Sequence, residues 1–133
     1  MPQIVASAAR PSQPTHLHKC QFHVAFLNLK EIIEMPTKTV GGKVSAKGTS
    51  IGTATGYRST RVETGRYIVV FDPPFKDIHG FSATQIYSEE QGSTLDNVVV
   101  QSIENGQVQV KTGDSSGHMR DREFTFVAYG EVA

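Results

Sequence analysis

Apolar and polar residues alternate in short runs after residue 56, with the period of two that is typical of half-buried β-strands. The run at 107–112 is the clearest, because Val108 and Val110 face one side while the polar residues between them face the other. The same pattern predicts strands at 57–64, 66–71, 81–88, 98–104, 107–112 and 123–132. About seven or eight short strands in roughly 90 residues predict an all-β fold, a small antiparallel β-sandwich or jelly roll.

Glycine and proline positions predict how these strands are connected. Gly65 supplies a tight turn between the first two predicted strands, and Asp72-Pro73-Pro74 ends the second because proline cannot donate to a ladder. Asn105-Gly106 predicts a two-residue hairpin turn in which both residues have positive φ. Apolar residues on both sides of 67–71 predict a strand buried on both faces, either central in its sheet or at a subunit interface.

The beginning of the chain differs in composition from the rest. All twelve glycines and all five aspartates lie from Gly41 onward, whereas the start is rich in proline and serine. We therefore expect an N-terminal extension at 1–35 and a β-sandwich domain at 36–133. The extension could be native, or it could be an upstream translation of a shorter protein that starts at Met35.

Within this extension the sequence predicts two kinds of structure. Residues 1–15 are expected to be disordered or to act as a swapped arm. Apolar residues at three- and four-residue steps predict a short helix at 21–34, which Pro36 would end. A strand at 20–27 is the alternative.

Charge and composition exclude several classes of protein. Thirteen Lys and Arg balance thirteen Asp and Glu, so neither a nucleic-acid partner nor a polybasic membrane anchor is expected. No run approaches the ~18 apolar residues of a transmembrane helix, so we expect no membrane insertion. No signal peptide is visible, and a single cysteine excludes an intramolecular disulfide framework.

Three groups of segments carry a resemblance to a known family. They are Gly56–Arg61 with Gly65–Phe71, then Pro74-Phe75 with Phe81–Thr84, and finally Phe124–Gly130. Over roughly residues 43–132 the chain resembles the C1q/tumour-necrosis-factor-like jelly-roll domains of phage tail-fibre and bacterial collagen-like surface proteins. The chain departs from that family at His79-Gly80, where a proline often precedes the strand. The resemblance implies a compact homotrimer located on a virion or an extracellular surface structure.

An oligomer is also expected on physical grounds. A sandwich of about 90 residues buries only some 60–65% of its unfolded surface, so it is marginal alone. Strands that are apolar on both faces offer surface beyond what one small core needs, and a closed trimer would bury it. The predicted interface residues are Tyr67, Phe71, Phe126 and Tyr129, and a monomer with a few exposed aromatic residues is the alternative.

Loops are the expected binding regions, because the sandwich holds them while their tips stay exposed. The candidates are the loops at 77–80, 88–94 and 113–121. The third combines Asp114, Ser115, His118 and Arg120, a mixture that could hydrogen-bond the hydroxyl groups of a glycan. Asp114 and Asp121 are the carboxylates of this loop that could bind calcium. The loop lacks the fixed spacing of ligands found in calcium-binding loops, so two carboxylates alone are weak evidence for such a site.

The sequence contains few of the motifs that indicate catalysis or the binding of a cofactor. No nucleophile elbow or Walker loop is present, and the adjacent carboxylates at 89–90 and 121–123 are typical of solvated loops. His16, His18, Cys20 and His23 are suitable zinc ligands, but no second ligand pair accompanies them. We therefore expect no enzymatic activity, no cofactor and no metal.

Three functions compete on this basis. The first is a non-enzymatic trimeric jelly-roll module of a phage or bacterial surface fibre, serving assembly or attachment to a glycan or protein receptor. The second is a free-standing small lectin, and the third is a hydrolase with a degenerate site. The hairpin at 57–71 and the strand at 123–132 favour the first.

Overall fold

The computed structural model describes residues 36–133, and residues 37–133 form a compact unit. The predicted arm at 1–15, the predicted helix at 21–34 and the His16–His23 ligand candidates lie outside the described residues. The division of the chain at residue 35 stays a prediction for the same reason. Within the part of the chain that is described, no helical segment has the length and apolar character needed to span a membrane.

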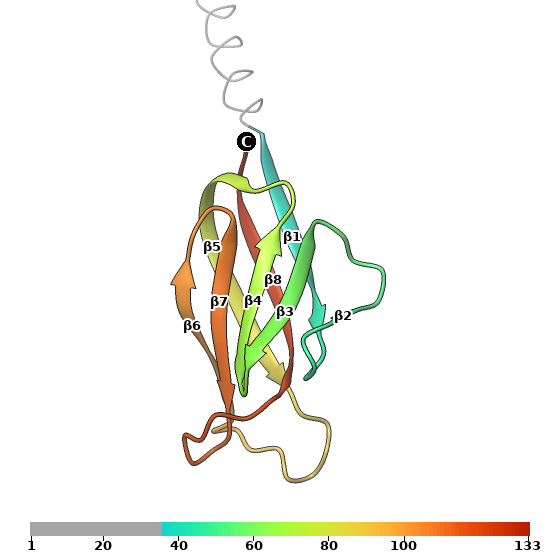
Figure 1. Cartoon of the computed structure of the whole chain (residues 1–133), viewed down its shortest axis with the longest axis vertical. Coiled ribbons are helices and arrows are strands. Elements are labelled where there is room, and N and C mark those ends of the chain that lie inside the picture. Colours follow the sequence, from blue (N-terminus) through green and yellow to red (C-terminus); the bar gives the residue numbers. More distant parts are fainter. Residues whose placement is uncertain (1–35) are drawn as a thin grey trace, which may run out of the picture. The chain divides into compact units, whose positions relative to one another are not determined.

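The described residues form eight strands in two antiparallel sheets, which confirms the predicted all-β sandwich (Figure 1). One sheet has the strand order β2-β1-β8-β5 and the other has the order β3-β4-β7-β6. The strands are β1 (Thr37–Val44), β2 (Ser50–Ile51), β3 (Tyr57–Glu63), β4 (Arg66–Phe71), β5 (Phe75–Ile86), β6 (Asn97–Ile103), β7 (Gln107–Gly113) and β8 (Glu123–Val132). All six predicted strands are therefore present, and β1 and β2 are additional.

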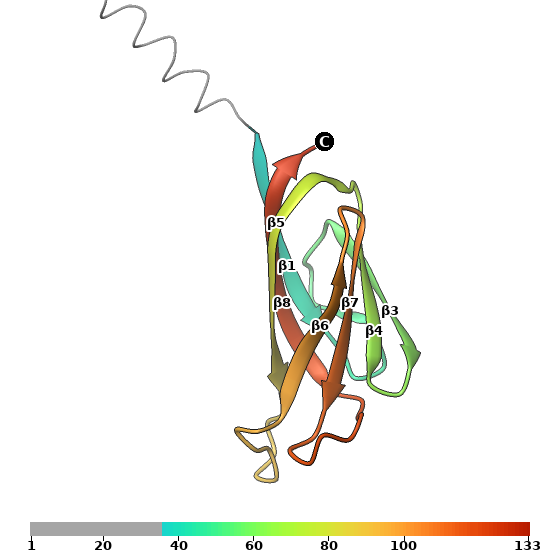
Figure 2. The ribbon, with the colours of Figure 1, turned by 90° about the vertical axis from the view of Figure 1, so that its left-hand side faces the viewer.

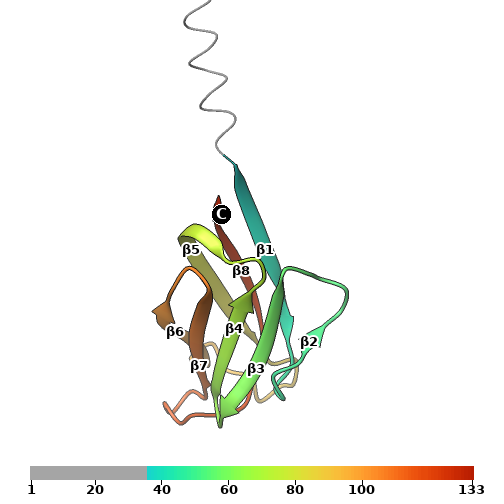
Figure 3. The same cartoon turned by 45° about the horizontal axis from the view of Figure 1, so that its top comes forward.

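The two sheets pack face to face, as Figure 2 shows. β8 lies between β1 and β5, so the first and last strands of the sandwich are neighbours along the whole of β1 (Figure 3). β4 lies between β3 and β7, which confirms that the doubly apolar run at 67–71 is a central strand.

Alternation within the strands places the core between the sheets. The buried apolar residues are Val40, Val44, Tyr57, Tyr67, Val69, Phe71, Phe75, Val108, Val110, Phe124, Phe126 and Ala128. Two edge-to-face aromatic pairs connect the layers: Tyr57 meets Phe126 at a ring-centroid distance of 4.8 Å, and Tyr67 meets Phe124 at 5.3 Å. Such pairs add about 0.5–1.5 kcal/mol each to the burial of their apolar area, so they fix how the sheets face one another.

The turn at Asn105-Gly106 is a two-residue hairpin loop, as predicted, but its backbone differs from the prediction. Glu104 and Gln107 exchange backbone hydrogen bonds of 2.8 and 3.3 Å across the turn. The predicted positive φ at Gly106 is wrong, because positive φ occurs at Gly48, Gly52, Gly56, Gly65 and Gly117 among the described glycines. Phe71 and Phe75 donate backbone N–H bonds to the carbonyl groups of Gly106 and Asn105, and these contacts shape the turn.

The predicted loop at 77–80 is also wrong, because this segment is part of β5. The strand begins at Phe75 and pairs with β8, with register shifts between Phe75 and Asp77 and between Ile78 and Gly80. These β-bulges interrupt the regular alternation, which is why the local pattern looked like a loop.

Candidate functional site

The predicted binding residues Asp114, Ser115, His118 and Arg120 lie in the loop between β7 and β8. Gly113 and Met119 form an isolated antiparallel bridge that closes this loop. The Gly117 N–H donates to the Asp114 carbonyl at 3.0 Å, and the positive φ of Gly117 permits the sharp turn. The loop is therefore ordered by its own backbone.

Asp114 is the centre of this loop. Its Oδ1 accepts backbone N–H bonds from His118 and Ser116, both at 2.9 Å, and its Oδ2 accepts the Arg120 Nε–H at 3.1 Å. The N–H of His118 is the largest cause that lowers the pKa of the Asp114 carboxyl to about 2, with further lowering from Arg120. Because its oxygens are already used inside the loop, Asp114 supports the site rather than offering a free acceptor.

Asp121 attaches the other end of the loop to the β3–β4 hairpin. Its Oδ1 accepts the Arg61 Nε–H and the Gly65 N–H, both at 2.8 Å. The hydrogen bond from Arg61 is the main cause that lowers the pKa of the Asp121 carboxyl. Beside it, the buried Thr112 hydroxyl donates to the Arg120 carbonyl, so two side chains hold the loop against the sandwich.

A hollow of about 390 Å³ lies between this loop and β6. Asp114, Ser115 and His118 contribute to its lining, whereas Arg120 does not. Leu95 and Val99 form an apolar side of the hollow and are both exposed to solvent, Leu95 at 71%. Polar groups beside an apolar wall are typical of small-ligand sites.

Leu95 and Val99 were not among the predicted site residues. A signal for Val99 exists in the sequence, since three consecutive valines at 98–100 place one of them on the outer face of a strand whose inner face is already apolar. No comparable local signal identifies Leu95.

Of the four predicted interface residues, only Tyr129 lies on the surface. Tyr67, Phe71 and Phe126 are part of the protomer's own core, so their side chains are not available to a partner chain while the sandwich is closed. The Tyr67 hydroxyl donates to the Ala46 carbonyl at 2.7 Å and accepts the Arg122 N–H at 3.2 Å, and burial raises its pKa. Inward-facing and outward-facing positions alternate, and Tyr67 and Phe126 fall on the inward set.

The outer face of β8 presents two apolar side chains to solvent. Tyr129 is 54% exposed and Val127 is 44% exposed. On the neighbouring strands, Gly41 is the Cα partner of Val127 and Gly80 is the Cα partner of Tyr129. Partners in an antiparallel pair face the same side, so the two apolar side chains lie beside small residues at the centre of this face, while Lys43 lies toward one end of it and Asp77 and Glu131 toward the other.

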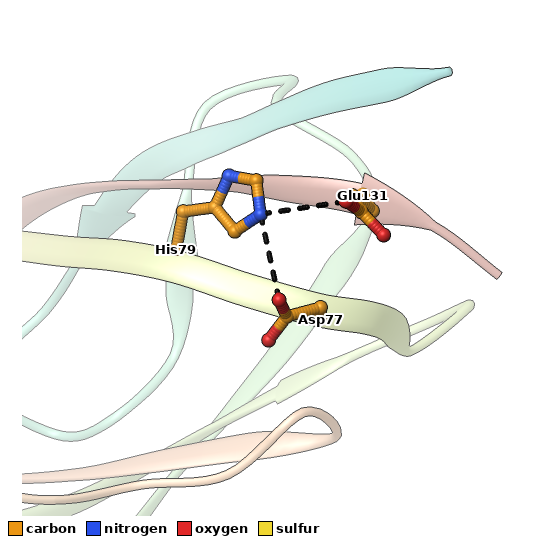
Figure 4. A group of neighbouring side chains, drawn as sticks. All are labelled: Asp77, His79 and Glu131. Atoms are coloured by element: carbon orange, nitrogen blue, oxygen red, sulfur yellow. Dashed lines mark ion pairs between the residues drawn. The ribbon is translucent and has the colours of Figure 1, made fainter. Parts of the chain in front are cut away.

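Asp77, His79 and Glu131 are the side chains that could hold a metal among residues 36–133 (Figure 4). The His79 Nε2 lies 3.5 Å from Asp77 Oδ2 and 3.8 Å from Glu131 Oε1. The sequence singles out 77–80 as a functional loop, but it indicates neither the strand conformation of this segment nor its approach to Glu131.

Comparisons of the chain with protein-family models, with curated proteins and with solved structures gave no match.

Proposed function

We propose that the domain is a non-enzymatic trimeric module of a phage or bacterial surface fibre, serving assembly or attachment to a receptor. The observation that carries this proposal is the outer face of the sheet β2-β1-β8-β5, where Val127 and Tyr129 are exposed side by side on β8. Isolated surface apolar residues are ordinary, but two on successive outward positions of one central strand favour a contact surface.

The surroundings of this pair suit a close approach between protomers. Thr39, Gly41, Ser82 and Thr84 face the same side on β1 and β5, as their pairing with β8 requires, and they are small and uncharged. At the centre of the face these small residues let a second backbone come near without displacing long side chains, and the charged residues of the face lie toward its ends. The Tyr129 ring lies across Gly80. A Cβ added at Gly80 would be only 2.8 Å from the Cε1 atom of Tyr129.

Burial of this face would contribute to association through the removal of apolar surface from water. A fully buried aromatic or aliphatic side chain is worth about 1.5–3 kcal/mol on that basis. Tyrosine suits the edge of such a contact, since its ring is apolar and its hydroxyl can remain hydrated. In a closed ring each protomer repeats the contact, so a small face supports a stable assembly.

The mass of the purified full chain tests the proposal. Sedimentation equilibrium is expected to give about three times the 14.5 kDa protomer mass. Tyr129→Glu should lower this mass because it places a charge in the contact, while the matched control Val62→Glu, at an exposed apolar position on β3 in the other sheet, should leave it unchanged. A stable monomer, or a trimer insensitive to Tyr129→Glu, would contradict the proposed face.

A small lectin is the second candidate, and the hollow beside Leu95 and Val99 is the observation that favours it. Sugar rings combine hydroxyl groups with apolar faces, which match Ser115 and His118 on one side and the two apolar residues on the other. A glycan array distinguishes the candidates: binding by the Tyr129→Glu protein that is lost in Leu95→Asp would favour the lectin.

A further inference from the structure

A cluster of three ionisable side chains lies at the end of the sandwich where β5 begins and β8 ends. Asp77 and His79 come from β5, and Glu131 comes from β8 (Figure 4). All three are accessible to solvent, and Glu131 is the most covered, with 26% of its side chain exposed. The cluster is separate from the loop at 113–121 and from the hollow beside it.

The backbone explains why these residues converge. Asp77 is the Cα partner of Glu131, so both side chains point to the outer face of the sheet. Ile78 pairs with Gly130 and Gly80 pairs with Tyr129, which leaves His79 as the extra residue of a β-bulge. A bulge redirects its side chain, and here it places the imidazole between the two carboxylates.

Neighbouring contacts hold this arrangement in place. The Asn105 side chain accepts the Ile78 N–H at 3.0 Å and donates to the Lys76 carbonyl at 2.9 Å, so it ties the backbone on both sides of Asp77 to the β6–β7 turn. The Tyr129 ring packs edge-on against the His79 ring, with centroids 6.0 Å apart. β5 and β8 approach each other closely at this point, since Gly130 has no Cβ. A Cβ at this position would overlap the Asp77 carbonyl oxygen.

The spacing of the ligand atoms fits an ion better than it fits direct hydrogen bonds. At 3.5 and 3.8 Å, the imidazole nitrogen is too far from the carboxylate oxygens for good hydrogen bonds. Ligands about 2.0–2.2 Å from a tetrahedral ion lie roughly 3.3–3.6 Å from one another. The potential ligand atoms of the three residues all lie within 4.8 Å of one another, so small rotations of the exposed carboxylates would complete the geometry.

We propose that Asp77, His79 and Glu131 bind one divalent transition-metal ion, and that zinc fits the ligand set best. A neutral imidazole and two carboxylate oxygens suit zinc, and its +2 charge neutralises the two carboxylates. Three protein ligands leave a fourth position open to water or to an outside donor. The proposal goes beyond the proposed function: the cluster lies on the same outer face as Tyr129, but all three ligands come from one protomer, so zinc binding is tested separately from trimer formation.

Zinc titration followed by calorimetry tests this site. The full chain is used with His16, His18, Cys20 and His23 all replaced by alanine, so that the N-terminal ligand candidates cannot contribute. One zinc ion per chain is expected to bind. His79→Gln should weaken binding at least about tenfold, since the loss of even an outer-shell partner costs 10–100-fold in metal affinity.

Two further variants make the result specific. Glu131→Gln should also weaken binding, which provides a second test from a different strand. His118→Gln is the matched control, because His118 is an exposed histidine beside a carboxylate, Asp114, at 3.5 Å, and it should bind zinc as the parent chain does. Absence of zinc binding in the parent, or binding that survives both His79→Gln and Glu131→Gln, would overturn the proposal.

Discussion

On its inner face β8 places Phe124, Phe126 and Ala128 against the opposite sheet, whereas on its outer face it places Val127 and Tyr129 toward solvent. Both sets are apolar and they alternate along one strand. The inner set makes aromatic contacts with Tyr57 and Tyr67 on the other sheet, while the ring of Tyr129 packs beside Gly80 and His79 on its own sheet.

The difference shows that apolar character alone does not assign a residue to a subunit interface. A strand that is apolar on both faces still commits one complete set of alternate positions to its own core. Only the other set can meet a partner chain. Whether a position faces the core or the solvent therefore decides which role its side chain can have. Tyr67 and Tyr129 are both tyrosines on doubly apolar strands, yet only Tyr129 is accessible.

Phe124→Ala should have the largest effect and provides the most direct test of this comparison. Phe124 is fully buried and packs against Tyr67, so truncation would leave a cavity and lower the free energy of unfolding by about 3–5 kcal/mol. Tyr129→Ala on the outer face should change the stability of the protomer by only about 0.5 kcal/mol. Equilibrium unfolding in urea at low protein concentration measures both, and equal losses would contradict the assignment of the two faces.

Gly130→Ala should have an intermediate effect. A Cβ at this position would meet backbone atoms of β5, namely the Asp77 carbonyl oxygen, the Ile78 Cα and the His79 nitrogen. One strand must move to admit it, which should cost about 1–3 kcal/mol of stability. Gly106→Ala is the control, since the nearest atom to its added Cβ lies 3.9 Å away and its φ is not positive, so the change should be neutral or stabilising by up to about 1 kcal/mol. The reverse order in urea unfolding would show that β5 and β8 are not in close contact here.

Asp114→Asn should have the smallest effect at neutral pH, and that effect should disappear in acid. The folded protein holds the pKa of Asp114 at about 2, below the ordinary value of 3.8, so the ionised carboxyl stabilises the fold above about pH 4. This contribution is lost as the pH falls from about 4 through 2. The difference in urea midpoint between the parent and Asp114→Asn should shrink over that range.

Glu90→Gln is the control for this experiment, because it removes an exposed carboxylate from the loop before β6. Its urea midpoint is compared with that of the parent over the same pH range. A difference for Asp114→Asn that stays constant between pH 4 and pH 2 would contradict the role of Asp114 in ordering its loop.

Most of the sandwich could be predicted because hydrophobic alternation is a local signal. The predicted strand bounds for β4 and β8 agree with the structure, and those for β3, β6 and β7 differ by a single residue at their ends. β1 was missed because two consecutive glycines, Gly41 and Gly42, interrupt its threonine and valine residues, and glycine is depleted in strands. The structure supplies the reason for Gly42: the Tyr57 ring occupies the space that a Cβ would need.

The candidate sites were less predictable because they depend on contacts between distant segments. The sequence correctly indicated a loop with Asp114, Ser115 and His118, but not that the Asp114 oxygens are used within it. Asp77 and Glu131 come together only through the pairing of β5 with β8. Asn105 was interpreted from its turn alone, although its side chain also holds the backbone around Asp77.

The pairing of β1 with β8 has a mechanical consequence. The strands are antiparallel, and Thr37 at the start of β1 is the partner of Glu131 near the end of β8. A pulling force applied at these two points would act across the ladder, along its hydrogen bonds, rather than along the strands. The hydrogen bonds of the ladder would then break one after another from Thr37 toward Val44, which is the unzipping geometry. A domain tethered at both of these points would therefore yield at a lower force than one pulled in shear, where all the bonds of the ladder carry the load together.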